Sequence, residues 1–417
     1  MKKILILGGG TAGTLAANRL RRMYSENEAE IVVVDQDDNH IYQPGLLFVP
    51  FGLKQTDDLI RSRQRQLHSG ITYTQSVIDH VDIARDRVLL SDGSLLSYDV
   101  LIVATGAVLL PDETEGLTGP AWNRDVFTFY SPEGAQGLAE ALRSFDHGRL
   151  VVNVIDMPIK CPVAPLEFAF LADWFFTQSG RRDRVELTYV TPLDGAFTKP
   201  IASEMLGGTL EEKGIHLVTG FNTGEVDGET KQLVGYDGRT VPFDLAVVVP
   251  LHGGAAYVGR SEGLGDELNF IHTDERTLQS RAKPNIFAMG DAAGIPTSKA
   301  GSVADFEGEV VCDNVRSFLN GEELAAHFDG HTNCFIETGY GKALLIDFNY
   351  ETEPLPGHYP LPVGLPLLKE SRANHAGKMM FEWLYWHVLL PGRALPGFGS
   401  AMPERGKVKE PATLRRS

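Results

Sequence analysis

The first 35 residues alternate between apolar runs and a glycine-rich segment, in the order that a β-α-β unit requires. Ile4 to Leu7 form a continuous apolar run, which is typical of a buried parallel strand. Gly8 to Gly13 follow, and apolar residues then recur at helical spacing from Leu15 to Met23. A second apolar run, Ile31 to Val34, ends in Asp35. The pattern therefore predicts a strand, a glycine turn, a helix and a second strand.

This order is that of a dinucleotide-binding unit, and the glycines have separate physical roles. Gly8 permits the tight turn, Gly10 lets backbone approach a pyrophosphate, and Gly13 lets the helix pack on the strand. Asp35 lies 22 residues after Gly13 and is placed to bind ribose hydroxyls. A glycine-rich turn in another kind of α/β protein is the alternative. The predicted contacts are made by Gly8, Gly10, Thr11, Ala12, Gly13 and Asp35.

Two later motifs favour FAD over NAD as the bound nucleotide. Residues 99–106 read Asp-Val-Leu-Ile-Val-Ala-Thr-Gly, and residues 286–293 read Ile-Phe-Ala-Met-Gly-Asp-Ala-Ala. Both resemble signatures of flavoproteins with two dinucleotide-binding domains, a resemblance which implies that Asp291 bonds the ribityl chain. A helix beginning near Lys299 would stabilise the anionic reduced flavin through its dipole. The implied FAD contacts are Thr105, Gly106, Gly290, Asp291 and Lys299.

A second unit near the middle of the chain lacks the nicotinamide signature. The predicted strand Leu150 to Ile155 leads into residues 156–162, which contain two prolines and no glycine. Without glycine, the backbone of this loop cannot approach a pyrophosphate closely. A helical pattern follows the loop. This argues against NADH or NADPH as the electron donor.

The chain has three cysteines, Cys161, Cys312 and Cys334, and none are in C-x-x-C spacing. No Cys/His cluster indicates a metal site, so no metal is expected. Cys161 is expected where a helix begins, with Pro162 at the first helical position, so that the helix dipole and Lys160 lower its pKa. An inert, half-buried cysteine is the alternative. Taken alone, Cys334 resembles an edge-strand residue, and Cys312 is expected to be a buried core residue.

Charge is distributed unevenly along the chain. The formal net charge is −17, which argues against nucleic acid as a partner. From Lys369 onward, nine Lys or Arg residues stand against four Glu residues. The start of the chain has an apolar run that is too short for a signal peptide and has no cleavage site, so no signal peptide is expected.

The segment 378–390 is unusually aromatic and is flanked by cations. It is too short to cross a bilayer but has the composition of a helix that lies in the membrane interface, with Trp383 and Trp386 inserted. An amphipathic helix that packs on the body, or in a dimer interface, is the alternative. Because the nucleotide motifs all precede Lys369, FAD binding is expected to be complete without this tail.

Several segments together resemble the sulfide:quinone oxidoreductase family over nearly the whole chain. They are residues 40–45 (His-Ile-Tyr-Gln-Pro-Gly), 160–167 (Lys-Cys-Pro-Val-Ala-Pro-Leu-Glu) and 334–340 (Cys-Phe-Ile-Glu-Thr-Gly-Tyr), with the aromatic C-terminus. The resemblance implies that Cys161 and Cys334 form a redox pair beside FAD. It also implies that Glu167 carries protons, although an exposed acid in the first helical turn is the alternative, and that Gln43 and Pro44 contact the cofactor. Residues 126–130 lack the further cysteine of many bacterial members.

The expected fold is α/β, with two Rossmann-like domains and a C-terminal helical tail that associates with membrane. Residues 1–110 and 255–330 form the FAD domain, 111–254 the second domain, and 331–417 the redox strand and tail. The expected activity is oxidation of sulfide to persulfide or polysulfide, with electrons passed to a quinone, on the cytoplasmic face of a membrane. The alternatives are a flavoprotein subunit of the flavocytochrome c sulfide dehydrogenase type, and a flavin-binding sulfur carrier or sensor. The sequence leaves open whether the protein forms a homo-oligomer.

Overall fold

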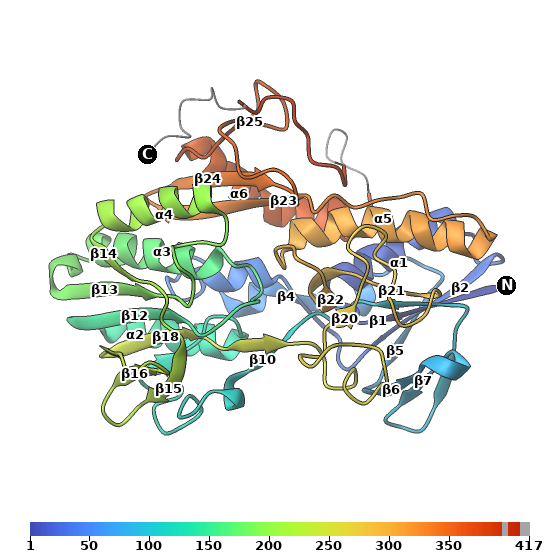
Figure 1. Cartoon of the computed structure of the whole chain (residues 1–417), viewed down its shortest axis with the longest axis horizontal. Coiled ribbons are helices and arrows are strands. Elements are labelled where there is room, and N and C mark those ends of the chain that lie inside the picture. Colours follow the sequence, from blue (N-terminus) through green and yellow to red (C-terminus); the bar gives the residue numbers. More distant parts are fainter. Residues whose placement is uncertain (394–398, 409–417) are drawn as a thin grey trace.

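The computed structural model describes residues 1–393 and 399–408 of the 417-residue chain. The β-α-β unit predicted at the start of the chain is confirmed, with its strands paired in parallel register from Lys2–Ala29 to Leu7–Val34. Two five-stranded parallel sheets lie side by side, as Figure 1 shows. The predicted α/β fold is therefore confirmed.

The first sheet combines strands from both ends of the predicted FAD domain. Its order is β21 (Ile286–Ala288), β9 (Val100–Val103), β1 (Lys2–Leu7), β2 (Ala29–Asp35) and β5 (Ile71–Gln75). Helices α1 (Thr11–Met23) and α5 (Gly301–Asn320) pack together over one face (Figure 1). Small antiparallel strands complete this part: β3 (Asn39–Ile41), β4 (Ile60–Ser62), β6 (Ile78–Asp82), β7 (Arg87–Leu90) and β8 (Leu95–Ser97), with the short parallel pair β20 (Ile271–His272) and β22 (Ala293–Gly294).

The second sheet comes entirely from the middle of the chain. Its order is β11 (Val126–Phe127), β18 (Leu245–Val249), β12 (Gly148–Val154), β13 (Val185–Val190) and β14 (Ile215–Val218). Its helices are α2 (Pro132–Ser144), α3 (Ala164–Gln178) and α4 (Pro200–Glu212). A small sheet of β15 (Thr223–Asp227), β16 (Gln232–Gly235) and β17 (Thr240–Pro242) lies beside it. The antiparallel pair β10 (Val108–Leu110) and β19 (Leu251–Gly253) links the two parts.

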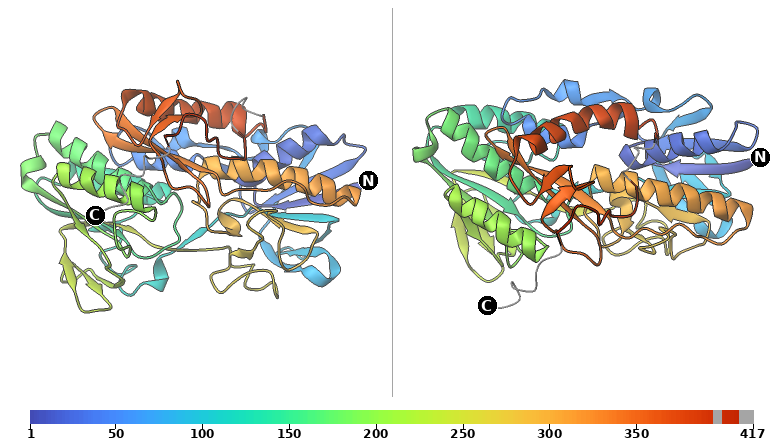
Figure 2. Two further views of the ribbon diagram at one scale, coloured as in Figure 1. Left: turned by 45° about the horizontal axis from the view of Figure 1, so that its top comes forward. Right: turned by 90° about the horizontal axis from the view of Figure 1, so that it is seen from above.

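The C-terminal part lies across both sheets rather than extending from the body. It contains the hairpin β23 (Thr332–Gly339) and β24 (Lys342–Phe348), the pair β25 (Gly357–Tyr359) and β26 (Leu365–Leu367), and helix α6 (Arg372–Leu384), which continues as a π-helical turn through Leu389. Strand β23 contacts both α3 and α5, and Figure 2 shows α6 and the hairpin between the helices of the two sheets. The exact domain boundaries stay a prediction.

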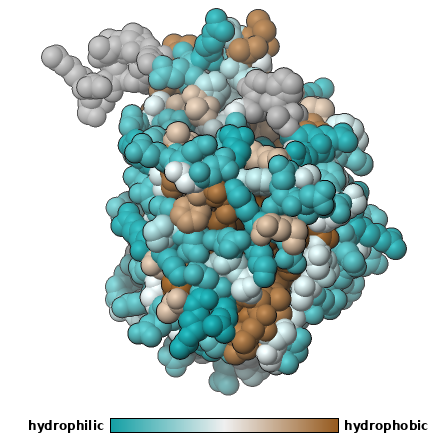
Figure 3. Space-filling view, turned by 90° about the vertical axis from the view of Figure 1, so that its right-hand side faces the viewer, coloured by the Kyte–Doolittle hydropathy of each residue, from teal (hydrophilic) through white to brown (hydrophobic). Residues whose placement is uncertain are grey.

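The exterior suits a strongly anionic chain. The end of the molecule that carries β2, α1 and α5 is covered mostly by hydrophilic residues, with hydrophobic areas between them (Figure 3). Among residues 1–393 and 399–408, no helix combines the length and apolar character needed to cross a bilayer.

Candidate active site

A cleft of about 540 Å³ opens at the carboxyl ends of the first sheet, where ligands bind in sheets of this kind. It reaches helix α3 of the second sheet, strand β23 and helix α6. Every predicted site residue except Gly13 lines it: Gly8, Gly10, Thr11, Ala12, Asp35, Gln43, Pro44, Thr105, Gly106, Cys161, Glu167, Gly290, Asp291, Lys299 and Cys334. The structure therefore brings together residues that are as far apart in the sequence as Gly8 and Cys334.

The glycines of the first turn stand where close packing and close approach require them. Gly8 has a φ of +95°, and a Cβ there would lie 2.4 Å from the carbonyl oxygen of Ala104. A Cβ on Gly13 would lie 1.8 Å from the carbonyl oxygen of Gly8, which explains why Gly13 is beneath the turn and not in the cleft. A Cβ on Gly10 or Gly106 would meet nothing within 4 Å. The cleft is thus open at the two glycines predicted to meet the nucleotide.

Two helices direct uncapped N-termini at this cleft. Neither α1 nor α5 has a side-chain cap or an acidic residue in its first turn, and both first turns line the cleft. Unpaired N–H groups at a helix N-terminus favour an anion, such as a pyrophosphate or a reduced flavin. These residues fit FAD: the first turn of α1 would hold the pyrophosphate, and that of α5 would face the flavin ring.

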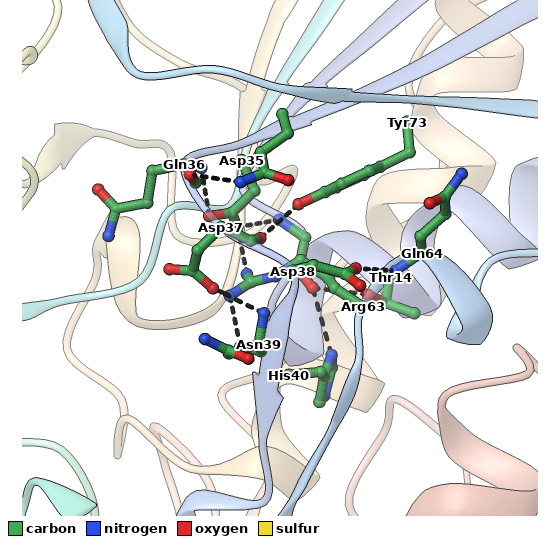
Figure 4. Close-up of polar contacts among 12 residues, drawn as sticks. Thr14, Asp35, Gln36, Asp37, Asp38, Asn39, His40, Arg63, Gln64 and Tyr73 are labelled. Carbon is green, nitrogen blue, oxygen red and sulfur yellow. Dashed lines mark hydrogen bonds and ion pairs between the residues drawn. The ribbon is translucent and has the colours of Figure 1, made fainter.

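Asp35 takes part in a polar network that the sequence did not predict (Figure 4). Its Oδ2 accepts a hydrogen bond from the backbone N–H of Gly9 at 2.7 Å and lies against Nη1 of Arg63. The second Arg63 nitrogen, Nη2, donates to Oδ1 of Asp37 at 3.1 Å and to the carbonyl oxygen of Asn39 at 2.6 Å. Burial raises the pKa of Asp35, and the Arg63 guanidinium opposes that shift. Arg63 therefore holds Asp35 at the end of the cleft where a ribose is expected.

Tyr385 connects the C-terminal part to the first nucleotide turn. Its hydroxyl lies 2.7 Å from both Thr11 Oγ1 and His40 Nε2. Nδ1 of His40 lies 3.3 Å from the carbonyl oxygen of Gly9, which can only accept, so Nδ1 carries the proton and Nε2 accepts from Tyr385. Burial lowers the pKa of His40 to about 3, which keeps the ring neutral. Residues after Lys369 therefore contribute to the wall of the cleft, and the retention of FAD without them stays a prediction.

Cys161 lies in the cleft, but its surroundings differ from those expected. Helix α3 begins at Ala164 with Pro165 in its first turn, so Cys161 and Pro162 precede the helix. Burial and then the nearby Glu167 carboxylate raise the pKa of Cys161 to about 12. The expectation of a lowered pKa is therefore wrong, because loss of hydration outweighs the helix dipole. The residue has a φ of +46°, and its backbone N–H donates to the carbonyl oxygen of Lys299 at 2.7 Å.

Cys334 lies inside β23, opposite Ile346 of β24, and also lines the cleft. Burial raises the pKa of its thiol, and the charge of Cys161 makes the next-largest contribution to that rise. Cys312 is fully buried in α5, away from the cleft, with its thiol 3.8 Å from the carbonyl oxygen of Ala16. All three cysteines are free thiols.

Glu167 is buried with 1% of its surface exposed, so the interpretation as an exposed first-turn acid is wrong. Its Oε1 accepts a hydrogen bond from the backbone N–H of Glu337 at 2.6 Å and contacts Nζ of Lys378 on α6. Burial raises the pKa of Glu167, and Lys378 offsets part of the rise. Burial lowers the pKa of Lys378, but Glu167 outweighs burial and the net shift is upward. The two groups therefore form a charged pair inside the cleft.

Lys160, Lys299 and Asp291 form a second charged group. Lys299 donates to the carbonyl oxygens of Asp291 and Ala293, at 2.8 and 3.1 Å. Burial raises the pKa of Asp291, and the two lysines oppose the shift. Burial lowers the pKa of Lys160. The loop before α3 is thus tied to the start of α5 through Cys161 and its neighbours.

The aromatic segment is mostly packed on the body. Trp386 is 4% exposed and lies under the guanidinium of Arg61, whose Cζ is 4.0 Å from its ring centroid. The expectation that Trp386 inserts into a membrane is therefore wrong. Trp383 is 58% exposed and Met380 is 57% exposed, both on α6.

Sequence reasoning missed the roles of Arg63, Lys378 and Tyr385 in the cleft. Lys378 and Tyr385 were assigned to a membrane-facing tail because the local composition suits an interface. Their separation of seven residues places them on one face of a helix, and this was the available signal. Arg63 is not part of any motif found in the sequence, and its position in the cleft depends on how residues 39–63 fold.

The sequence model of the pyridine nucleotide-disulphide oxidoreductase family matches residues 2–152. A mitochondrial sulfide:quinone oxidoreductase of Dictyostelium discoideum is 28% identical over 94% of this chain and 86% of its own length. One from Mus musculus is 26% identical over the same shares of each chain. The solved sulfide:quinone oxidoreductase of Aquifex aeolicus has a TM-score of 0.80, with 18% identity over 94% of this chain and 92% of its own.

The fold and the cleft define an FAD-dependent α/β flavoprotein oxidoreductase. Within that class, the chain is an oxidoreductase similar to the sulfide:quinone oxidoreductases, and the resemblance noted from the sequence is confirmed.

Proposed function

We propose that the protein oxidises sulfide through a Cys161–Cys334 pair and passes the electrons through FAD to a membrane quinone. The observation that carries this proposal is that both cysteines line the cleft that the FAD motifs also line. The names of the relatives support sulfide and quinone as substrates. Cys312 has no part in the proposal because it lies outside the cleft.

The sulfur chemistry follows from the oxidised pair. Hydrosulfide attacks one sulfur of the disulfide, forming a new S–S bond and breaking the bond between the cysteines. A persulfide is left on one cysteine and a thiolate on the other. A second hydrosulfide takes the outer sulfur and leaves as HSS⁻, and with the uptake of one proton both cysteines end as reduced thiols. Two electrons and two protons then leave the thiols as the disulfide reforms.

Bound FAD supplies the two-electron acceptor that this reoxidation needs and passes the pair to the quinone. The overall balance is two HS⁻, one H⁺ and one quinone giving HSS⁻ and one quinol. The chain supplies position and charge. Burial disfavours both thiolates, so the uncharged disulfide is a suitable resting form of the pair. Glu167 is proposed to take up the proton of a thiol, because it lines the same cleft as Cys161 and its charge acts on that thiol.

The quinone is proposed to reach the cleft beside α6, where Phe335 and Phe381 line it. Exposed apolar groups of the C-terminal part support association with a membrane surface. Val363 is 93% exposed and Leu361 is 49% exposed, in the loop between β25 and β26, in addition to Met380 and Trp383 of α6. These four residues, called here the apolar rim, would insert into the interface. The cytoplasmic face of the membrane stays a prediction.

The test is an anaerobic titration of the holoprotein with sulfide, followed by addition of a short-chain quinone. Sulfide should bleach the flavin and quinone should restore it. Cys161→Ser and Cys334→Ser should each lose at least about 90% of turnover because either change removes the bridge, while Cys312→Ser stays near wild type. Full turnover in both of the first two variants would show that the pair is not the redox centre. Bleaching that quinone cannot reverse would favour another electron acceptor, such as a haem partner.

A further inference from the structure

The end of the cleft where a ribose is expected holds two carboxylates that are joined by one arginine. Nη1 of Arg63 contacts Oδ2 of Asp35, and Nη2 donates to Oδ1 of Asp37 at 3.1 Å (Figure 4). All three residues line the cleft. Because Nη1 and Nη2 belong to one planar guanidinium, the two carboxylates are held side by side in a fixed arrangement.

Asp35 has little remaining capacity to accept hydrogen bonds. Its Oδ2 accepts from the backbone N–H of Gly9 at 2.7 Å as well as from Arg63, which occupies both lone pairs of that oxygen. Its Oδ1 accepts from the backbone N–H of Gln36 at 2.7 Å. Asp35 can therefore accept from one further donor, whereas the ribose of an adenosine presents two neighbouring hydroxyl groups.

Asp37 has the capacity that Asp35 lacks. Its Oδ1 accepts from Arg63 and, at 2.7 Å, from the backbone N–H of Asn39. Its Oδ2 accepts no hydrogen bond in the part of the chain that the structure describes. The side chain of Asp37 is 39% exposed and lines the cleft, so a hydroxyl group of a bound nucleotide can reach it.

Arg63 also keeps the two acids compatible with each other. Burial raises the pKa of Asp35, the Arg63 guanidinium is the largest opposing influence, and the charge of Asp37 adds to the rise. Arg63 itself is 9% exposed, and its Nε is buried without a hydrogen-bond partner among the described residues. A buried donor without an acceptor is costly, so this side chain is suited to a bound ligand that brings one.

We propose that Asp35 and Asp37 share the adenosine ribose of FAD, with each carboxylate accepting from one of its two hydroxyl groups, and that Arg63 positions both. Asp35 uses the remaining lone pair of Oδ1, and Asp37 uses its Oδ2. The sequence assigned the ribose to Asp35 alone. The inference goes beyond the proposed sulfur chemistry, because it concerns how the cofactor is held and applies whatever the electron donor is.

The test measures the affinity of the full-length protein, freed of its flavin, for FAD and for two analogues that lack the 2′ or the 3′ hydroxyl of the adenosine ribose. Wild type should bind FAD at least about tenfold more tightly than either analogue, because a hydrogen bond to a charged group is strong. In Asp37→Ala, this advantage of FAD should fall below about threefold for one analogue and stay for the other, since one hydroxyl has then lost its partner. In Arg63→Met, the advantage should fall below about threefold for both analogues, since neither carboxylate is then positioned.

Asp38→Ala is the matched control, because it removes a neighbouring carboxylate that does not line the cleft. Oδ1 of Asp38 accepts instead from the backbone N–H of Gln64 at 2.8 Å. Both advantages of FAD should therefore remain as in wild type. A wild-type protein that binds either analogue as tightly as FAD overturns the shared ribose, as does an Asp37→Ala protein that keeps both advantages or loses both.

A purely structural role for Arg63 predicts a different result. Arg63→Met would then bind FAD and both analogues more weakly by the same factor, and that outcome overturns the positioning role. Near-ultraviolet circular dichroism of each variant identifies any folding defect. A misfolded Arg63→Met is replaced by Arg63→Lys, which keeps the charge but cannot hold two carboxylates in one planar fork, and the same loss of both advantages is expected.

Discussion

Glu307 shows how strongly single buried charges are perturbed around the cleft. It lies in α5 with 1% of its surface exposed, and its Oε2 accepts a hydrogen bond from the backbone N–H of Gly290. Burial raises its pKa to about 8, although Gly290 and Lys299 oppose the shift. At neutral pH this carboxyl is mostly protonated in the folded protein and ionised in the unfolded chain.

This shift predicts a pH-dependent stability. The folded-state pKa of Glu307 is raised above the ordinary 4.5. The contribution of Glu307 to the free energy of unfolding is therefore complete below about pH 4.5 and is lost as the pH rises through about 8. Glu307→Gln keeps an acceptor for Gly290 but cannot ionise. The free energy of unfolding of wild type relative to the variant should therefore fall with rising pH, by up to about 4 kcal/mol. Urea unfolding of both proteins from pH 5 to 8.5, with FAD in excess, measures it, and parallel curves would contradict it.

A buried charged triad around Asp347 makes a second prediction. Oδ1 of Asp347, on β24, lies 2.9 Å from Nε2 of His331. Its Oδ2 forms an ion pair with Nζ of Lys407 at 2.5 Å, although these two atoms are not aligned for a hydrogen bond. Lys407→Met leaves a buried carboxylate without its main counter-charge and should destabilise the protein by about 3–5 kcal/mol. The double change Lys407→Met with Asp347→Asn should recover part of that loss. Equal unfolding midpoints for wild type and Lys407→Met would contradict this account.

For single residues, the sequence predicts where a side chain lies better than it predicts the burial and the charges around that side chain. Gly8, Gly13 and Asp35 could be placed because backbone geometry dictates the residue type at each position. The pKa of Cys161 could not be predicted, since it depends on the burial that α6 and β23 create around it. The contact of Glu167 with Lys378 joins residues 211 positions apart, and no local pattern encodes such a pair.

Helix α6 presents two apolar faces with different partners. Its inner side carries Lys378 and is followed by Tyr385 and Trp386, which contact the cleft and the first domain. Lys54 reinforces this docking by pairing with Glu382 at 2.7 Å. Its outer side carries Met380 and Trp383 of the apolar rim. The sequence indicated an amphipathic aromatic helix but not which aromatic residues face the body, because both faces carry tryptophan.

The two tryptophans should therefore respond differently to substitution. Trp386→Ala removes a buried ring and should cost about 3–5 kcal/mol of stability. Trp383→Ala should change stability by less than about 0.5 kcal/mol, since its ring is largely exposed. Thermal unfolding measures this difference, and similar losses in both variants would contradict it.

The membrane role of the outer face is tested by the double change Met380→Ser with Trp383→Ser. Flotation with liposomes should show at least about a tenfold loss of bound protein, because two inserted side chains are removed. Bleaching of the flavin by sulfide should be retained, since neither residue lines the cleft. Unchanged flotation would assign these residues to contacts between protein molecules instead.

On the scale of the whole molecule, the second domain keeps the architecture of a nucleotide-binding unit without its glycine turn. Strand β12 and helix α3 are both present, but the loop between them carries Lys160 and Cys161 in place of glycines. NADH and NADPH should therefore fail to bleach the flavin within minutes, while sulfide bleaches it. Anaerobic absorbance spectra measure this, and rapid bleaching by NADH would contradict the proposed electron donor.

The closure of the cleft by residues from opposite ends of the chain also determines when the cofactor can be acquired. Thr11 and Tyr385 are 374 positions apart and share a hydrogen bond. The ribosome releases the β-α-β unit early, but the wall that Tyr385 supplies emerges only 374 residues after Thr11. Such long-range closure is slow compared with local folding. Holoprotein should therefore form after translation, and its yield should depend on the free FAD that finished chains encounter.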